Sequence, residues 1–282
     1  MYVLLAALTQ MIYTFTPEPI DVVIPYHPKD AETLELCIRG IRENGENVRR
    51  IIVISKEPAT SSAEWFDEAN YPFSPEDLAL EIFHGDAEAA HTFLTAPNTR
   101  IGWIYQQFLK LYAPLVIPDI SSNVLILDSD VIFLKPLAFM DAKRQPYFTV
   151  GTNYTKEYFE HAAKLLPGLR RANLNYSGIV HHMLFQRPII DDLFHLISLQ
   201  HHTEPWKAIC RCIDQAEVYK SCLSEYEIYF NFVSLRTSQK TIRHIRWTEV
   251  VPDLYNINAY RRQNYIFIAS QEWYRRYCKD HQ

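Results

Sequence analysis

The chain has 282 residues, of which 48% are hydrophobic and 22% are charged, and its formal net charge is −5 at pH 7. This composition excludes a disordered chain, and the acidic excess argues against nucleic acid as the main partner, because phosphate contacts dominate that kind of binding. Only seven of the 282 residues are glycine, which is roughly 2.5% against about 7% in an average protein. The spacing of these glycines excludes a glycine-rich dinucleotide or phosphate loop. Any nucleotide must therefore be bound in another way.

Residues 1–15 are almost wholly apolar or small and carry no charge. The run is too short to span a bilayer, and it lacks the basic start of a secretory signal. We expect residues 1–19 to form an apolar N-terminal helix that packs on the rest of the protein. A weak membrane or export element, making peripheral membrane contact, is the alternative.

Two apolar runs on either side of a helical pattern predict a βαβ unit. Residues 20–26 are expected to form a buried strand, residues 31–45 a helix with one apolar face, and residues 50–55 the next strand. Strands connected in this way are parallel and are covered on both faces. Residues 56–77 are rich in proline, serine and acidic residues and predict a loop with a short helix.

A helix is expected from Thr99, and its side chains form two stripes. One stripe is apolar and suits the core. The other stripe suits a binding site, with a solvated polar face as the alternative, and it consists of Trp103, Gln106, Gln107 and Lys110. We expect Pro114 and Pro118 to break the chain before the next strand.

In the rest of the chain, expected strands continue to alternate with expected helices, and there is no internal repeat. We expect strands at 124–127, 147–150 and 179–183, and helices at 154–166, 191–199 and 225–235. These elements predict an α/β fold with a mostly parallel sheet and helices on both of its faces. Residues 20–245 are expected to form one domain, with residues 246–282 as a C-terminal extension packed on it.

The chain has five cysteines, and an odd number cannot form a closed disulfide framework. This favours a reducing compartment, so we expect a cytoplasmic protein, with the inner face of the membrane as an open alternative. Cys210, Cys212 and Cys222 follow His201 and His202. Because C-x-C is not the usual zinc spacing, we expect buried thiols here, with zinc as the alternative.

Two carboxylates one residue apart are the sharpest signal in the sequence. Asp128 and Asp130 follow the apolar strand at 124–127 and precede the apolar run at 131–134. Ligands of open α/β sheets bind at the carboxyl ends of strands, and two close carboxylates repel each other unless a cation lies between them. Mg²⁺ or Mn²⁺ fits, since each prefers oxygen ligands and takes others from water and substrate phosphates. We predict such a metal site for a diphosphate, with a turn whose aspartates cap backbone amides as the alternative.

Four sequence blocks follow one another in a distinctive order. They are the strand at 21–26, the stretch RIGWIYQQFLKLYAP at 100–114, the D-S-D motif with Lys135-Pro136 behind it, and SEYEIY at 224–229. Together they resemble the GT-A type nucleotide-sugar glycosyltransferases, and most of all an incompletely characterised bacterial subgroup. The resemblance covers most of residues 20–245.

This resemblance implies a GT-A-like, Rossmann-like fold with C-terminal helical additions. It also implies a hexosyltransferase-type enzyme that uses Mn²⁺ or Mg²⁺. The donor would be a nucleotide-diphosphate-sugar, in the first place a UDP-sugar. The acceptor would be a hydroxyl of a carbohydrate or glycolipid, in surface polysaccharide or glycolipid synthesis.

Individual roles follow from the resemblance. Asp130 would bind the metal directly, and Asp128 would reach the metal or the donor ribose. Nine residues would contact the donor and its cofactor, namely Pro25, Tyr26, His27, Arg100, Trp103, Gln107, Lys110, Asp128 and Ser129. Arg100 and Lys110 would contact the diphosphate or Asp128, and surface charges on an exposed helix are the alternative for these two.

A general base is predicted at the start of the last long helix. Ser224 and Glu227 have the spacing of a capping box, which assigns Glu227 a structural role. Glu225 is then the carboxylate that can project into a cleft. If the enzyme inverts the configuration at the anomeric carbon, Glu225 would accept the proton of the acceptor hydroxyl. The alternative is that Glu225 only complements the helix dipole.

Relatives often take a third metal ligand from a histidine. The candidates here are His181, His182, His244 and His281, although a lone histidine is more often structural. Because His181 and His182 are neighbours in an expected strand, they should point to opposite faces, and at most one can face the site.

The same D-S-D-V sequence also resembles the haloacid dehalogenase phosphohydrolases. Asp128 would then be the nucleophile and Asp130 the acid/base, with Asp191 and Asp192 as a second acidic pair. The late position of the motif and the placement of the second pair at a helix start argue against this. A non-enzymatic carbohydrate-binding module is the third alternative.

Overall fold

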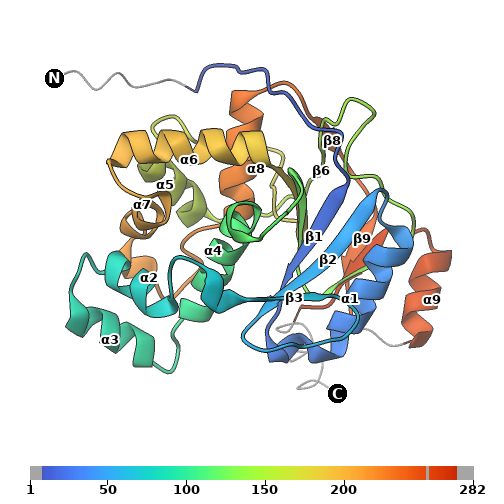
Figure 1. The fold of residues 1–282 in the computed structure, drawn as a ribbon, viewed down its shortest axis with the longest axis horizontal. Coiled ribbons are helices and arrows are strands. Elements are labelled where there is room, and N and C mark those ends of the chain that lie inside the picture. The colour runs from blue at the N-terminus through green and yellow to red at the C-terminus, as the bar shows by residue number, and fades with distance from the viewer. Residues whose placement is uncertain (1–7, 252–253, 272–282) are drawn as a thin grey trace.

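The computed structural model describes residues 8–251 and 254–271, and its centre is a five-stranded sheet (Figure 1). The strand order is β3-β2-β1-β4-β7. Four strands are parallel to one another, namely β1 (Ile20–Pro25), β2 (Val48–Ser55), β3 (Glu64–Asp67) and β4 (Asn123–Leu127), and β7 (His182–Gln186) is antiparallel to β4. The predicted α/β fold with a mostly parallel sheet is confirmed.

Helices cover both faces of this sheet (Figure 1). On one face lies α1 (Ala31–Asn44), and on the other lie α4 (Ile101–Val116), α6 (Arg187–His201) and α8 (Glu225–Arg236). Val22 and Ile24 of β1 belong to the core under α1, whereas Val23 between them belongs to the core under α4. Burial on both faces explains why β1 reads as a continuous apolar run.

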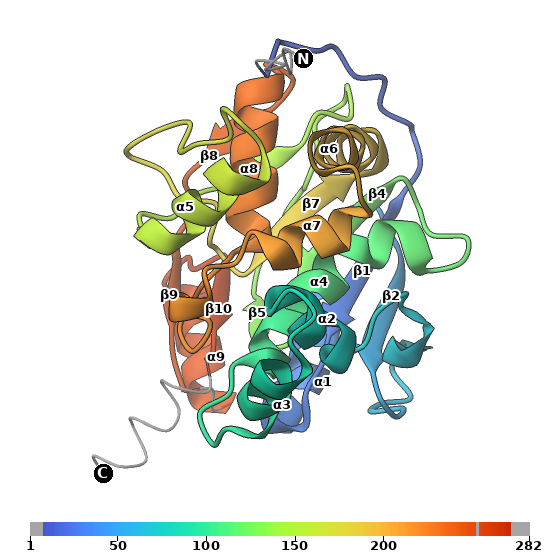
Figure 2. The same cartoon turned by 90° about the vertical axis from the view of Figure 1, so that its left-hand side faces the viewer.

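Shorter elements complete the fold. The other helices are α2 (Pro75–Ile82), α3 (Ala87–Thr95), α5 (Lys156–Leu165), α7 (Pro205–Arg211) and α9 (Leu254–Arg262). Two small sheets pair β6 (Tyr147–Thr149) with β8 (Thr241–Arg243), and β5 (Val131–Phe133) with β10 (Phe267–Ala269) and β9 (Trp247–Glu249). Figure 2 shows β9 and β10 beside β5, so the C-terminal part of the chain joins the strand that follows D-S-D.

The N-terminal segment differs from the prediction for residues 1–19. Residues 1–7 lie outside the described residues, and residues 8–19 contain no helix. Arg236 of α8 donates to the carbonyl of Thr9 at 2.9 Å, and the Gln239 amide donates to the carbonyl of Tyr13 at 3.0 Å. Side chains from the far end of the chain thus satisfy backbone groups that a helix would have paired internally.

The helix α4 runs through Pro114 and ends at Val116, so the prediction that Pro114 breaks the chain was wrong. A proline inside a helix removes the bond to the carbonyl four residues earlier. Because Pro114 lies in the last turn, only the bond to the Lys110 carbonyl is lost. No helix within the described part of the chain is long and apolar enough to cross a membrane.

The strand predicted at 179–183 begins later, at His182. The reason is local, because His181 has a positive φ of 64° and so cannot continue an extended strand. The following helix, predicted from Asp191, already begins at Arg187, since Pro188 fits the first turn of a helix. The loop predicted at 56–77 contains β3 and the start of α2.

Candidate active site

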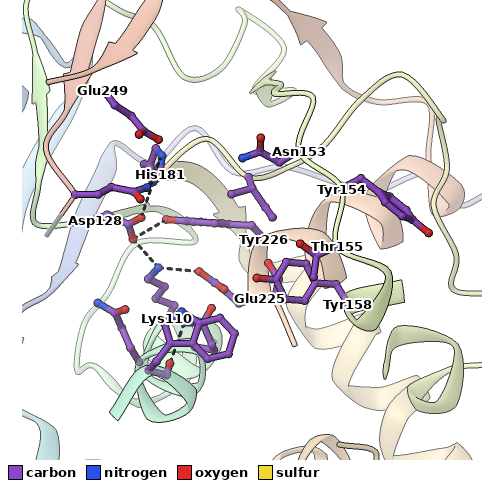
Figure 3. Close-up of a pocket in the computed structure, with 16 residues that line it drawn as sticks. Lys110, Asp128, Asn153, Tyr154, Thr155, Tyr158, His181, Glu225, Tyr226 and Glu249 are labelled. Atoms are coloured by element: carbon purple, nitrogen blue, oxygen red, sulfur yellow. Dashed lines mark hydrogen bonds and ion pairs between the residues drawn. The ribbon is translucent and has the colours of Figure 1, made fainter. Parts of the chain in front are cut away.

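A cleft of about 670 Å³ opens beyond the carboxyl end of β4 (Figure 3). Its walls come from several segments, namely α4, the residue after β4, the segment before α5 and α5 itself, the turn before β7, the start of α8, the end of β9, and the second residue after β10. The volume lies within the range of small-molecule sites. The cleft therefore collects side chains from segments that are far apart in the sequence.

Lys110 connects the acidic side chains of this cleft. Its buried Nζ lies 2.5 Å from Oδ1 of Asp128 and 2.8 Å from Oε1 of Glu225. The ammonium also lies 4.6 Å from the centre of the Tyr226 ring. Burial by itself would lower the pKa of Lys110, but the two carboxylates outweigh it and raise the pKa. Lys110 is therefore charged and ties α4 to β4 and α8.

Asp128 accepts hydrogen bonds on both carboxylate oxygens. The Tyr226 hydroxyl lies 3.3 Å from Oδ1, and Nδ1 of His181 lies 3.3 Å from Oδ2. Burial raises the pKa of Asp128, but Lys110 and His181 outweigh it and hold the pKa well below its usual range. Asp128 is therefore an ionised carboxylate fixed by three protein groups (Figure 3).

Glu225 is the first residue of α8, and only 1% of it is exposed. Burial raises the pKa of Glu225 and the ammonium of Lys110 lowers it, with a raised pKa as the net result. A carboxylate with a raised pKa is better suited to accept a proton near neutral pH than an ordinary surface glutamate.

The predicted capping box at the start of α8 forms on one side only. Ser224 is the N-cap, and its hydroxyl accepts from the amide of Glu227 at 3.2 Å. The Glu227 carboxylate does not return this bond, because it accepts from the Ser177 hydroxyl at 2.6 Å and from the Asn231 amide at 2.7 Å. Glu227 thus binds the turn before β7 to α8 and does not line the cleft.

His181 lies beside the acidic pair and lines the cleft. Its carbonyl accepts from the amide of Asp128 at 3.0 Å, and the Gln271 amide lies 3.0 Å from its Nε2. Burial lowers the pKa of His181, but the bond to Asp128 outweighs it and raises the pKa. The Trp247 ring packs edge-on at 5.4 Å.

The other histidine candidates lie elsewhere. His182 is buried among the rings of Phe133, Phe139 and Phe267, so of the neighbouring pair only His181 faces the site. His244 packs on Tyr176 and does not line the cleft. His281 lies outside the described residues.

Only some of the predicted site residues meet in the cleft. Those that line it are Trp103, Gln107, Lys110, Asp128 and Glu225. Those that do not line it are Pro25, Tyr26, His27, Arg100, Ser129 and Asp130.

The residues outside the cleft have structural contacts. Pro25 is buried within the sheet, and His27 accepts from the amide of Lys29 at the start of a short 3-10 helix. The Ser129 hydroxyl donates to Asp30 at 3.0 Å. The Arg100 guanidinium lies 4.8 Å from the Trp103 ring centre, so Arg100 supports a cleft residue without lining the cleft.

Several cleft residues carried no sequence signal. The segment before α5 and α5 itself supply Asn153, Tyr154, Thr155 and Tyr158, and the C-terminal part of the chain supplies Glu249 and Gln271. Tyr226 was visible only as part of the S-E-Y block. No motif or periodicity marks the others, because the tertiary structure brings loop residues together.

Neither alternative centre is supported. Within residues 8–251 and 254–271, no group of three or more His, Cys, Asp and Glu side chains is arranged to hold a metal ion, so a zinc site at the cysteines is not supported. Asp192 of the second acidic pair accepts from Arg236 at 2.7 Å and from Tyr13 at 2.6 Å, and it does not line the cleft. The dehalogenase alternative is not supported either.

Comparisons with known proteins give a family model and matches among solved structures. A family model described as "Family of unknown function (DUF6492)" matches residues 20–278. No curated protein sequence matches the chain. Among solved structures, the crystal structure of mouse xyloside xylosyltransferase 1 in its apo form has a TM-score of 0.41 and 9% sequence identity, and the match covers 90% of this chain and 97% of that chain.

Proposed function

The chain belongs to the DUF6492 family of unknown function, and we propose that it is a glycosyltransferase that uses a nucleotide-diphosphate-sugar, of the UDP-sugar type, and a hydroxyl acceptor. The observation that carries the proposal is the convergence of Asp128, Lys110 and Glu225 in one cleft at the carboxyl end of a parallel strand. The D-S-D and S-E-Y blocks, far apart in the sequence, meet there. The Lys110 ammonium bridges Asp128 and Glu225, and the Tyr226 hydroxyl donates to Asp128.

The charges of the cleft support a need for a further cation. Three lining carboxylates, from Asp128, Glu225 and Glu249, stand against Lys110 and His181. A diphosphate would add negative charge to a cleft whose described acids already outnumber the side chains that can be positive. Binding of such a donor therefore requires a cation that comes with it.

We assign this role to Mn²⁺ or Mg²⁺ at the D-S-D motif. The ion would be held by Asp128, which lines the cleft, and by Asp130, which lies two residues further on and outside the lining. Their carboxylate oxygens are ligands that both ions prefer, and an ion that completes its shell with water and phosphate oxygens needs few protein ligands. When bound, the ion would neutralise the departing nucleoside diphosphate.

The protein's own groups have separate tasks in this scheme. Lys110 holds Asp128 and Glu225 at fixed distances and keeps both carboxylates from repelling each other. Glu225 takes the proton of the acceptor hydroxyl at its carboxylate as the hydroxyl oxygen attacks the anomeric carbon, in an inverting reaction. The raised pKa of Glu225 suits this task.

The proposal is tested by incubating the protein with Mn²⁺ and a panel of nucleotide sugars and measuring nucleoside diphosphate release. We expect release from one class of donor, loss of release with EDTA, and recovery when Mn²⁺ is restored. Hydrolysis of a phosphomonoester without any nucleotide-sugar turnover would refute the proposal.

The role of Glu225 has its own test. Glu225→Gln should retain Mn²⁺-dependent donor binding in calorimetry but lose transfer by roughly 100-fold or more, because general base catalysis contributes about that much. The matched control is Glu227→Gln, two residues along the same helix and outside the cleft lining. Transfer by Glu225→Gln at the wild-type rate would place the base elsewhere.

A further inference from the structure

The cleft has two chemically different ends. One end carries the charged and titratable side chains Lys110, Asp128, His181 and Glu249. The other end carries the aromatic rings of Tyr154 and Tyr158 and the hydroxyl of Thr155, and the lining also includes Trp103 and Asn153. Figure 3 shows Tyr154, Thr155 and Tyr158 together on the side away from Asp128 and His181, with Glu225 between the two ends.

Two of these aromatic rings are held in place before any ligand binds. Tyr154 is 58% exposed, yet its ring lies within 12° of parallel to the Phe159 ring at 5.5 Å, and Arg171 lies 4.9 Å from its centre. The Trp103 ring has the guanidinium of Arg100 at 4.8 Å. An exposed ring that is already fixed loses little conformational freedom when a ligand packs on it. This end of the cleft is therefore a preorganised surface.

We propose that this aromatic end binds the acceptor, and that the acceptor is a neutral saccharide. The proposal rests on the glycosyltransferase function proposed above and adds the acceptor class and its position. A pyranose ring has an apolar face of C–H groups and a rim of hydroxyls. The face packs on the ring of Tyr154, and the hydroxyls bond to Thr155, which lies on the same side of the cleft.

The position of Glu225 connects the two ends. An acceptor on the aromatic rings presents a hydroxyl to Glu225, while the donor diphosphate lies at the charged end. The acceptor O–H bond breaks with its proton passing to Glu225, and the oxygen forms a bond to the anomeric carbon. The bond from that carbon to the diphosphate oxygen breaks, and its electron pair leaves with the nucleoside diphosphate.

The lining carboxylates of the cleft disfavour an anionic acceptor, even though the guanidinium groups of Arg171 and Arg100 lie against the Tyr154 and Trp103 rings. Glu225 and Glu249 line the cleft and would repel a carboxylate on the acceptor sugar. The nucleotide base is the rival occupant of the aromatic rings, since bases also stack on aromatic side chains. The two occupants can be distinguished by removing the Tyr154 ring. If a saccharide acceptor binds there, the acceptor KM rises, and if the nucleotide base binds there, the donor KM rises.

The test uses the full chain, its donor from the nucleotide-sugar panel, and two series of probes. The neutral probes are methyl glucopyranoside, methyl galactopyranoside and methyl mannopyranoside, and the anionic probe is methyl glucuronide. Tyr154→Ala removes the ring, and Tyr154→Phe keeps it as the matched control. The KM values for donor and acceptor are measured separately, and thermal melting verifies that each variant is folded.

We expect Tyr154→Ala to raise the acceptor KM about tenfold, the size of effect of losing one aromatic stacking contact, and to change the donor KM by much less. Tyr154→Phe should keep the wild-type acceptor KM. The glucuronide should be a far poorer acceptor than the neutral glucoside.

Several outcomes overturn the acceptor proposal. They are an unchanged acceptor KM in Tyr154→Ala, a rise in the donor KM instead, equal use of the glucuronide, or nucleoside diphosphate release without transfer to any neutral glycoside. If the wild-type protein releases no nucleoside diphosphate from any nucleotide sugar, the proposed function has failed instead.

Discussion

At the scale of single residues, one buried ammonium group decides how the acids of the cleft are arranged. The Lys110 side chain is 4% exposed, and it contacts a carboxylate 115 positions further along the chain as well as Asp128. Burying an ammonium costs several kcal/mol unless it is paired. Without it, Asp128 and Glu225 would be close like charges in a poorly solvated site. The charge of Lys110 thus offsets the repulsion between the carboxylates of Asp128 and Glu225.

Lys110→Met is expected to lower the free energy of unfolding by about 3–5 kcal/mol, because it leaves buried carboxylates without their cation. Urea unfolding measures the loss. Lys156→Met is the control, since the ion pair of Lys156 with Glu160 lies on the surface and should contribute nothing measurable. The double variant Lys110→Met/Glu225→Gln should recover part of the loss. Wild-type stability in Lys110→Met would contradict this account of the site.

At the scale of elements, α8 matters because it is buried along almost its whole length. A helix surrounded by protein shows little amphipathic pattern, so its position cannot be inferred from periodicity. Its start is fixed by the N-cap of Ser224, one residue before Glu225. The cap therefore sets both the helix boundary and the direction in which the proposed base points.

Ser224→Ala should lower the free energy of unfolding by about 1 kcal/mol, the usual effect of losing an N-cap. We also expect it to lower the transfer rate, because Glu225 loses its fixed helix start. Ser74→Ala is the matched control, since Ser74 caps α2 in a complete capping box and does not line the cleft. It should reduce stability to a similar extent and leave transfer unchanged. Equal transfer by both variants would contradict the positioning role of Ser224.

At the scale of the whole molecule, two buried histidines make stability depend on pH. Burial lowers the pKa of His161 to about 4 and that of His182 to about 3. Nε2 of His161 lies 2.9 Å from the carbonyl of Ile209, which joins α5 to α7. Above the ordinary histidine pKa both the folded and the unfolded chain hold these rings neutral. Below it only the unfolded chain takes up the protons, so acid favours unfolding.

The free energy of unfolding should therefore fall as pH drops from about 6.5 toward 4, with His161 alone contributing about 3 kcal/mol. Urea unfolding at a series of pH values across this window measures the slope. His161→Gln keeps an amide that can donate to Ile209 but does not titrate, so its slope should be smaller than that of the wild type. A stability that does not change between neutral pH and pH of about 4.5 would contradict the neutral state of these rings.

The whole molecule also determines which parts of the chain reach the cleft. Glu249 of β9 and Gln271, just after β10, both line it. The strand β10 pairs with β5, directly after the D-S-D motif. Residues beyond 245, which the sequence marks only as an extension, thus contribute to the site.

The sequence by itself determined the local elements and the polar residues at their ends. The sequence predicts the strands β1, β2 and β4 from continuous apolar runs and the helices α1 and α4 from the period of 3.6 residues. Short motifs place Asp128 after a strand and Glu225 at a helix start. These signals depend on neighbours along the chain and can therefore be read without the fold.

Only the tertiary structure decided what those residues contact. Lys110 pairs with Glu225, and the ring of His181 contacts the carboxylate of Asp128. Tyr154 lies on the wall of the same cleft. These residues come from segments that share no sequence pattern. The same folding left Pro25, Tyr26 and His27 outside the cleft. The physical reason is that contacts across the chain depend on how loops close and cores pack, and neither process leaves a periodic trace in the sequence.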